Sequence, residues 1–122
     1  MTTKAIAKRL VALCRKQQWE KAQTELYADT ATSTEPAARP GFPKVVKGLP
    51  KILQKGRAFG EMVEQMHSLD VSEAIIAGNV FACTMTMDCT MKGMGRAKMA
   101  ELCVYHAKDG KIVAEEFFFS EC

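Results

Sequence analysis

Several signals of specialised chemistry are missing from this sequence of 122 residues. Its five cysteines are odd in number and include no C-x-x-C pair, which argues against a disulfide framework or a zinc site and favours reduced thiols. No apolar run approaches the ~20 residues that a membrane-spanning helix needs, and the apolar residues near the start are too widely spaced for a secretory signal. We therefore expect a cytoplasmic protein that does not contact a membrane.

Charge and motif content argue against further classes of protein. The net charge of +3 is too small and too dispersed to indicate nucleic-acid binding. The sequence shows no metal-ligand cluster, phosphate loop or nucleophile triad, so no metal and no cofactor is predicted. With 48% hydrophobic and 25% charged residues, the chain is typical of a globular protein, and its length indicates one domain over residues 1–122.

The last third of the chain predicts three strands joined into two hairpins. Alternate residues from Phe81 to Met91 are apolar, which is typical of a strand with one buried face. A glycine-rich turn follows that strand, and a second strand is predicted from Arg96 to Ala107. Asp109-Gly110 is a strong signal for a two-residue hairpin turn before a third strand, Lys111 to Ser120.

A two-residue turn fixes the expected register of the second hairpin, in which Lys108 faces Lys111 and Leu102 faces Phe117. The face assigned to the interior then consists of Ala100, Leu102, Val104, His106, Val113, Glu115, Phe117 and Phe119. The face assigned to the outside consists of Glu101, Cys103, Tyr105, Ile112, Ala114, Glu116 and Phe118. A buried, unpaired Glu115 would be costly, so we expect it to pair with His106 or an arginine, or to lie at the wet end of the sheet.

Upstream, the spacing of apolar residues predicts helices. One helix lies in the first nineteen residues, with Thr2 or Thr3 as its N-cap, although its basic composition loosely resembles a transit peptide. A second helix is expected at about Trp19 to Tyr27, and a third opens at Leu49-Pro50 and carries an apolar stripe as far as Met66.

Strands complete this upstream half. A short strand is expected from Thr30 to Pro36, before an irregular loop, and another from about His67 to Ala77. The predicted fold class is α+β: a curved antiparallel β-sheet with about three N-terminal helices packed on its concave face, forming a cone-shaped α+β barrel.

Three local stretches resemble one family. They are Leu26-Tyr27-Ala28-Asp29-Thr30-Ala31, Glu35-Pro36, and Asp109-Gly110-Lys111-Ile112 followed by Phe117-Phe118-Phe119. Together with the order of elements, they resemble the SnoaL-like branch of the nuclear-transport-factor-2-like superfamily, which includes the ketosteroid isomerases. The resemblance implies a cone-shaped pocket, but it does not imply one activity, because this fold hosts many.

For isomerase chemistry, the resemblance implies a carboxylate base and two acidic donors, a tyrosine and a protonated aspartate. It places Glu35 at the position of the base, and Val11 and Leu102 at the positions of the donors. Loss of one donor typically lowers the rate on the order of 10²–10³-fold, so the standard ketosteroid isomerase reaction is not expected. Isomerase- or hydrolase-like acid/base chemistry using Glu35 remains open.

We expect an apolar small molecule to bind between the helices and the sheet. The predicted lining is Trp19, Phe59, Met62, Met66, Cys83, Met85, Met87, Leu102, Val104, His106, Glu115, Phe117 and Phe119. Methionine is flexible and polarizable and so suits an adaptable apolar surface. The alternative is a methionine-rich core with nothing bound.

Two hypotheses of function follow. One is a ligand-binding or catalytic cone, and the other is a non-enzymatic interaction module that forms a homodimer through the outer sheet face around Tyr105, Glu116 and Phe118. The basic segment from Lys44 to Arg57 is compatible with an acidic partner or with an ordinary solvated helix face.

Overall fold

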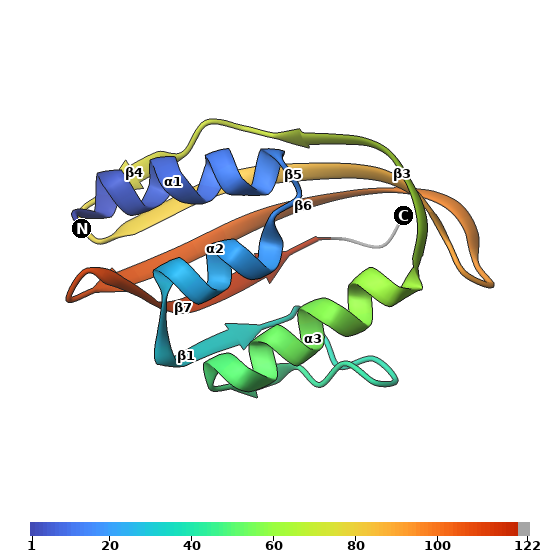
Figure 1. The fold of residues 1–122 in the computed structure, drawn as a ribbon, viewed down its shortest axis with the longest axis horizontal. Helices are drawn as coiled ribbons and strands as arrows, with labels where there is room; N and C mark the ends of the chain where they lie inside the picture. Colours follow the sequence, from blue (N-terminus) through green and yellow to red (C-terminus); the bar gives the residue numbers. More distant parts are fainter. Residues whose placement is uncertain (120–122) are drawn as a thin grey trace.

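Three helices cover one face of a seven-stranded sheet in the computed structural model, which describes residues 1–119 (Figure 1). The elements in chain order are α1 (Thr3–Arg15), α2 (Trp19–Leu26), β1 (Tyr27–Thr34), β2 (Val45–Lys47), α3 (Leu49–Met62), β3 (Val63–Val71), β4 (Ile75–Ala77), β5 (Val80–Met91), β6 (Gly95–Lys108) and β7 (Lys111–Phe118). Helix α1 packs against β3, β4 and β5, whereas α2 and α3 pack against β1. The predicted α+β class, with helices on one face of the sheet, is confirmed.

The sheet has the strand order β2-β1-β7-β6-β5-β3, and β4 pairs with β5. The predicted antiparallel arrangement of β5, β6 and β7 is confirmed, but β1 pairs with β7 in parallel. Strand β2 was not predicted, and the expected strand from His67 to Ala77 is instead two strands, β3 and β4. The sheet is mixed and does not close, because β2 and β3 lie at its two ends.

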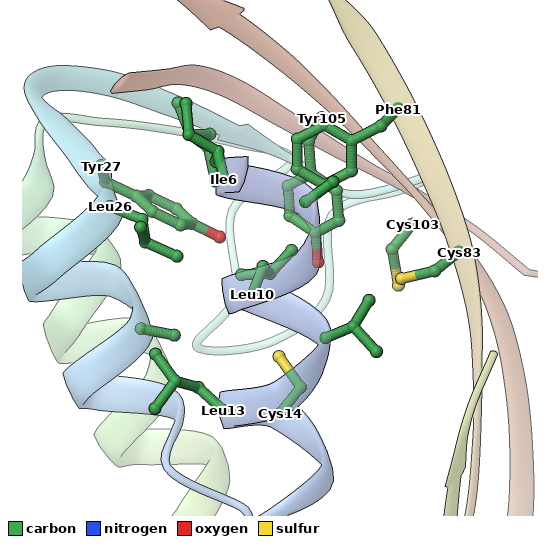
Figure 2. Close-up of a cluster of buried hydrophobic side chains, with 14 of the residues drawn as sticks. Ile6, Leu10, Leu13, Cys14, Leu26, Tyr27, Phe81, Cys83, Cys103 and Tyr105 are labelled. Atoms are coloured by element: carbon green, nitrogen blue, oxygen red, sulfur yellow. The ribbon is translucent and has the colours of Figure 1, made fainter. Parts of the chain in front are cut away.

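Helix α1 follows the predicted stripe. Ile6, Leu10, Leu13 and Cys14 are buried (Figure 2), and the Thr2 side chain caps the helix by accepting a hydrogen bond from the Ala5 amide at 3.1 Å. The prediction for α3 was too long, since this helix ends at Met62 and Met66 lies in β3 opposite Cys89. The β-branched Val63 begins the extended segment, where its side chain fits a pleated sheet better than a helix.

The first hairpin carries the core of the molecule. All six alternate apolar residues of β5, from Phe81 to Met91, are buried as predicted. Directly opposite them on β6 lie the inward-facing residues of that strand, with Phe81 opposite Tyr105 and Cys83 opposite Cys103. The Phe81 and Tyr105 rings stack with centroids 5.0 Å apart (Figure 2).

The predicted phase of β6 is therefore wrong. Cys103 and Tyr105 are buried, whereas Leu102, Val104 and His106 belong to the opposite, outer face. The phase of β6 is set by its antiparallel pairing with β5, whose buried face is unambiguous. The two branched aliphatic residues of β6, Leu102 and Val104, are therefore left on the outer face.

The turn between β6 and β7 is as predicted, but the pairing beyond it is not. Asp109 and Gly110 have positive φ angles of 51° and 79°, and Lys108 faces Lys111. A β-bulge then interrupts the ladder at Val113, so that Leu102 faces Phe118 rather than Phe117. Ile112 keeps its expected partner Ala107, so the corrected phase of β6 puts it inside, although it was assigned outside. The bulge then lets Glu115 and Phe117 face inward as expected.

Candidate functional site

Six polar or charged side chains face the covered side of the sheet and form what we call the polar cluster: Tyr27, Ser33, Glu35, Lys55, Glu101 and Glu115. They come from β1 and the residue after it, from α3, and from β6 and β7. The parallel pairing of β1 with β7 brings the first three beside Glu115, because Ser33 and Glu115 are register partners.

Lys55 lies at the centre of the polar cluster. Its Nζ donates to Ser33 Oγ at 2.6 Å and to Glu35 Oε1 at 2.9 Å, and it lies 5.3 Å from the centre of the Phe117 ring. The side chains of Lys55 and Glu35 are only 13% and 20% exposed, so this ion pair is far better shielded from solvent than a surface pair. One turn of α3 thus holds an ammonium group over the ends of β1 and β7.

Glu115 is almost fully buried and is satisfied by hydroxyl groups. The Tyr27 hydroxyl donates to Glu115 Oε1, and the Ser33 hydroxyl donates to the same carboxyl. The prediction that Glu115 pairs with His106 or an arginine is wrong, because His106 faces out and lies 3.4 Å from Glu116. Burial raises the pKa of Glu115, and the two hydrogen bonds partly oppose this rise.

The hydroxyl of Tyr27 stays protonated over the whole physiological range. Burial, followed by the negative charge of Glu115, raises the pKa of Tyr27 well above its ordinary value. Ser33 accepts a hydrogen bond from Lys55 and donates to Glu115, so a continuous chain of hydrogen bonds runs from Glu35 to Tyr27. These hydrogen bonds connect the outer end of the polar cluster, at Glu35, with its buried end, at Tyr27.

Glu101 is the member of the polar cluster that sequence reasoning missed. It lies on β6 directly opposite the buried Met85 and therefore faces inward. Burial, followed by the negative charge of Glu35, raises the pKa of Glu101 to about 7, while Cys103 and Lys55 lower it. The Cys103 thiol donates to Glu101 Oε1 at 3.7 Å. A carboxyl that titrates near neutral pH can both accept and return a proton, as general acid–base catalysis requires.

The structure places the remaining predicted site residues in three groups. Cys83, Met85 and Met87 are buried in the sheet core, while Trp19 and Phe117 pack against the core and remain partly exposed. Partial burial is also found for Phe59, Met62 and Met66. On the outer face lie Leu102, Val104 and His106, which the phase error had put in the lining. Phe119 follows β7 and carries the Arg39 guanidinium over its ring, at 4.7 Å.

An open hollow lies at the outer end of the polar cluster. It is lined by Thr34, Glu35, Pro36, Lys44, Glu116, Phe117 and Phe118. Glu35 and Phe117 belong both to the hollow and to the surroundings of Lys55, so a molecule in the hollow would be close to the ammonium group. A second hollow, beside Trp19, Leu53 and Arg57, lies between α2 and α3.

Within residues 1–119, no three His, Cys, Asp or Glu side chains are grouped so as to hold a metal ion. Over the same described range, none of the helices has the length and apolar character that crossing a membrane requires.

Helices on one face of an open seven-stranded sheet, with a polar cluster between the two layers, define an α+β cone of the nuclear-transport-factor-2-like kind. The family model of the SnoaL-like domain matches residues 1–119, and the chain belongs to this family. A search of curated proteins finds no match.

Solved structures give the same fold. A protein of Mesorhizobium loti, named as a candidate SnoaL-like polyketide cyclase, is 30% identical, with a TM-score of 0.89 and coverage of 98% of this chain and 100% of that one. A Catenulispora acidiphila protein with a ketosteroid isomerase-like fold, in complex with trimethylamine, is 16% identical, with a TM-score of 0.73 and coverage of 94% and 85%. TerC, co-crystallised with polyporic acid, is 17% identical, with a TM-score of 0.77 and coverage of 98% and 92%.

Proposed function

We propose that the protein binds a small, largely apolar carbonyl compound in the hollow beside Glu35 and Phe117 and transfers a proton on it. The observation that carries this proposal is the inward-facing Glu101, whose pKa is raised to about 7 beside a shielded ammonium group. The similarity to a candidate polyketide cyclase, over 98% of this chain and the whole of that one, supports a cyclic or polycarbonyl substrate.

In the proposed reaction, the substrate extends from the hollow past Glu35 and Phe117 into the polar cluster, and the Glu101 carboxylate removes a proton from a carbon next to the carbonyl group. Lys55 stabilises the negative charge that develops on the carbonyl oxygen, which is the role of a preorganised donor. The protonated Glu101 then returns the proton to another carbon of the same enolate. Phe117 offers its ring to the apolar part of the substrate, and Glu35 holds Lys55 in place.

The expectation against ketosteroid isomerase chemistry changes in one respect. It rested on Val11 and Leu102 at the donor positions, but Leu102 faces out and its neighbour Glu101 faces in. An inward carboxyl is therefore present one residue earlier on the same strand, whereas Val11 is a buried residue of α1 without a hydroxyl. The standard isomerase site is thus not reproduced, and the proposed chemistry uses Lys55 instead of a tyrosine donor.

Deuterium exchange into an enolisable bicyclic ketone, 2-tetralone, tests this function. We expect the wild-type protein to accelerate exchange above the buffer rate, and Glu101→Gln to lower that acceleration by roughly 10²-fold or more, in line with the usual contribution of a general base. Proton NMR in deuterated buffer measures the rate. The exposed Glu64→Gln on β3 is the matched control and should leave the rate unchanged.

The comparison with Glu35→Gln distinguishes the two candidate bases. If Glu101 is the base, the rate of Glu35→Gln stays pH-dependent but its midpoint moves to lower pH, because the charge of Glu35 helps to raise the pKa of Glu101. Binding weakens, because Lys55 loses its carboxylate partner. A pH profile that disappears in Glu35→Gln and persists in Glu101→Gln would assign the base to Glu35. Absence of both binding and exchange with wild-type protein would contradict the proposal for this substrate class.

A second candidate function, a homodimeric interaction module, is favoured by the outer sheet face. Leu102 and Phe118 are register partners there and are 41% and 49% exposed. Tyr105, which the sequence had placed in this interface, is buried and cannot take part. The proposed dimer is therefore centred on Leu102 and Phe118, with the same patch meeting itself around a two-fold axis.

Light scattering tests the dimer. We expect the wild-type protein to have twice the 13.5 kDa mass of one chain at high micromolar concentration, and Phe118→Glu to reduce it to a monomer. Ile75→Glu, which changes a more exposed residue on β4, is the control and should leave the dimer intact. A monomeric mass for the wild-type protein under these conditions would contradict the proposed dimer.

A further inference from the structure

Two thiols face each other across the centre of the sheet. Cys83 on β5 and Cys103 on β6 are direct register partners, both on the inward face, and both are free thiols. A hydrogen bond joins the two side chains, and Figure 2 shows them together beside α1, on the strands that face it. Opposed residues of antiparallel strands have Cβ atoms about 4.5–5.5 Å apart, close to the spacing of about 3.5–4.5 Å that a disulfide needs.

We propose that Cys83 and Cys103 form an oxidation site, at which a hydroperoxide converts the two opposed thiols into a cross-strand disulfide. This inference does not rest on the proposed function. It rests on the placement of the two thiols, which a modest approach of two already paired strands would join.

The reaction balances in two steps. The Cys83 thiolate attacks one oxygen of the hydroperoxide, the O–O bond breaks, and the leaving oxygen takes up a proton to become an alcohol, or water if the oxidant is hydrogen peroxide. Cys83 is then a sulfenic acid. The Cys103 sulfur attacks it, the S–O bond breaks, and the hydroxyl group leaves as water with the Cys103 proton. Overall, two thiols lose two electrons and two protons, and one hydroperoxide is reduced.

The surroundings assign different roles to the two thiols. The hydrogen bond between the two thiols lowers the pKa of Cys83, and the positive charge of Arg15 acts in the same direction against the effect of burial. The hydrogen bond to Cys83 and burial raise the pKa of Cys103. Because the thiolate is the nucleophile, Cys83 is the residue that attacks the oxidant first, and Cys103 resolves the sulfenic acid.

The other described cysteines lack one of these features. Burial raises the pKa of Cys14 to about 12, so this residue of α1 has almost no thiolate at neutral pH. Cys89 lies on the same face of β5 as Cys83, but its register partner is Ala97, which has no sulfur. Cys89 is therefore a matched control within the same strand.

Formation of the disulfide would also change the pKa of Glu101 in the polar cluster. The Cys103 thiol donates to Glu101 at 3.7 Å, and this hydrogen bond lowers the pKa of Glu101. A disulfide removes the thiol hydrogen, so the pKa of Glu101 should rise further and its carboxylate form should become scarcer at neutral pH. Only the functional meaning of this second effect rests on the proposed function.

Peptide mapping by mass spectrometry tests the oxidation site. Cys122 lies outside the described residues, so the experiment uses a Cys122→Ser background, treated with hydrogen peroxide and then with an alkylating reagent under denaturing conditions. We expect a loss of two hydrogen atoms, a peptide pair joined through Cys83 and Cys103, and full reversal by dithiothreitol. Cys89→Ser should behave in the same way, whereas Cys83→Ser and Cys103→Ser should each abolish the disulfide.

The Cys122→Ser protein, which keeps Cys83 and Cys103, tests the proposal even if one of the other serine variants does not fold. Joined peptides from Cys14 and Cys83 would overturn the proposal, and so would two unlinked thiols or only sulfinic acid after treatment. Carboxyl NMR of Glu101 in the reduced and oxidised proteins measures the second effect. An unchanged Glu101 pKa after disulfide formation would reject the coupling while leaving the oxidation site in place.

Discussion

Replacing Glu101 by glutamine is expected to remove a loss of stability that this group causes as pH rises. The pKa of Glu101 is raised from 4.5 to about 7 in the folded protein, mainly by burial. Between these two values the folded state binds more protons than the unfolded state, so wild-type stability falls as pH rises. The shift in the pKa of Glu101 corresponds to about 3 kcal/mol of unfolding free energy. This stability is fully present below pH 4.5 and is lost as pH rises through about 7.

Urea unfolding of both proteins between pH 4 and pH 8 measures this effect. The free energy of unfolding of Glu101→Gln, relative to wild type, should rise by about 3 kcal/mol across that range. Glu64→Gln removes an exposed carboxyl from β3 and should follow the wild-type curve closely. A constant difference between Glu101→Gln and wild type at every pH would show that burial does not shift this group.

Replacing Lys55 by methionine is the second change with a large expected effect. It removes the only ammonium group that contacts Glu35 and Ser33 in the described structure and leaves a shielded carboxylate without its counter-charge. Breaking a buried pair by removing one partner costs about 3–5 kcal/mol, and we expect roughly 3 kcal/mol here because the pair is partly exposed.

A double variant separates the lost pair from the lost packing. In Lys55→Met/Glu35→Leu no charge is left behind, so we expect it to be more stable than Lys55→Met alone, as measured by thermal and urea unfolding. Lys51→Met, one turn earlier on α3 and exposed, is the control and should change stability very little. Equal destabilisation by Lys51→Met and Lys55→Met would mean that the interactions of Lys55 with Glu35 and Ser33 do not stabilise the fold.

The parts of the fold that could be predicted from the sequence are those with a local cause. The Thr2 cap, the apolar stripe of α1, the alternation of β5 and the turn at Asp109-Gly110 all depend on a few neighbouring residues. The bulge at Val113 has no such local signature, and it shifted the pairing of β6 with β7 by one residue. Parallel pairing of β1 with β7 depends on residues far apart in the chain, so local patterns did not indicate it.

The candidate site was missed because the phase of β6 was assigned from local composition and not from its pairing with β5. Counting apolar residues favoured Leu102 and Val104 as the inner face of β6 and placed Glu101 outside. A signal for the correct phase was nonetheless present, because β5 has one clearly buried face and its hairpin with β6 extends that face to Cys103 and Tyr105. Deriving the register from the first hairpin, rather than the second, would have placed Glu101 inside.

The pairing of β1 with β7 also bears on how the chain is made. Tyr27 and Glu115 are hydrogen-bonded although 88 positions separate them, so β1 can pair with β7 only when the last hairpin has left the ribosome. Until then, the nascent N-terminal half has its helices and only the short β1–β2 pair, without the rest of the sheet. Closing so long a loop costs conformational entropy before the stabilising contacts form, which is typical of slow-folding topologies. The unfinished chain exposes apolar surface during that time, and such surface is what chaperones bind.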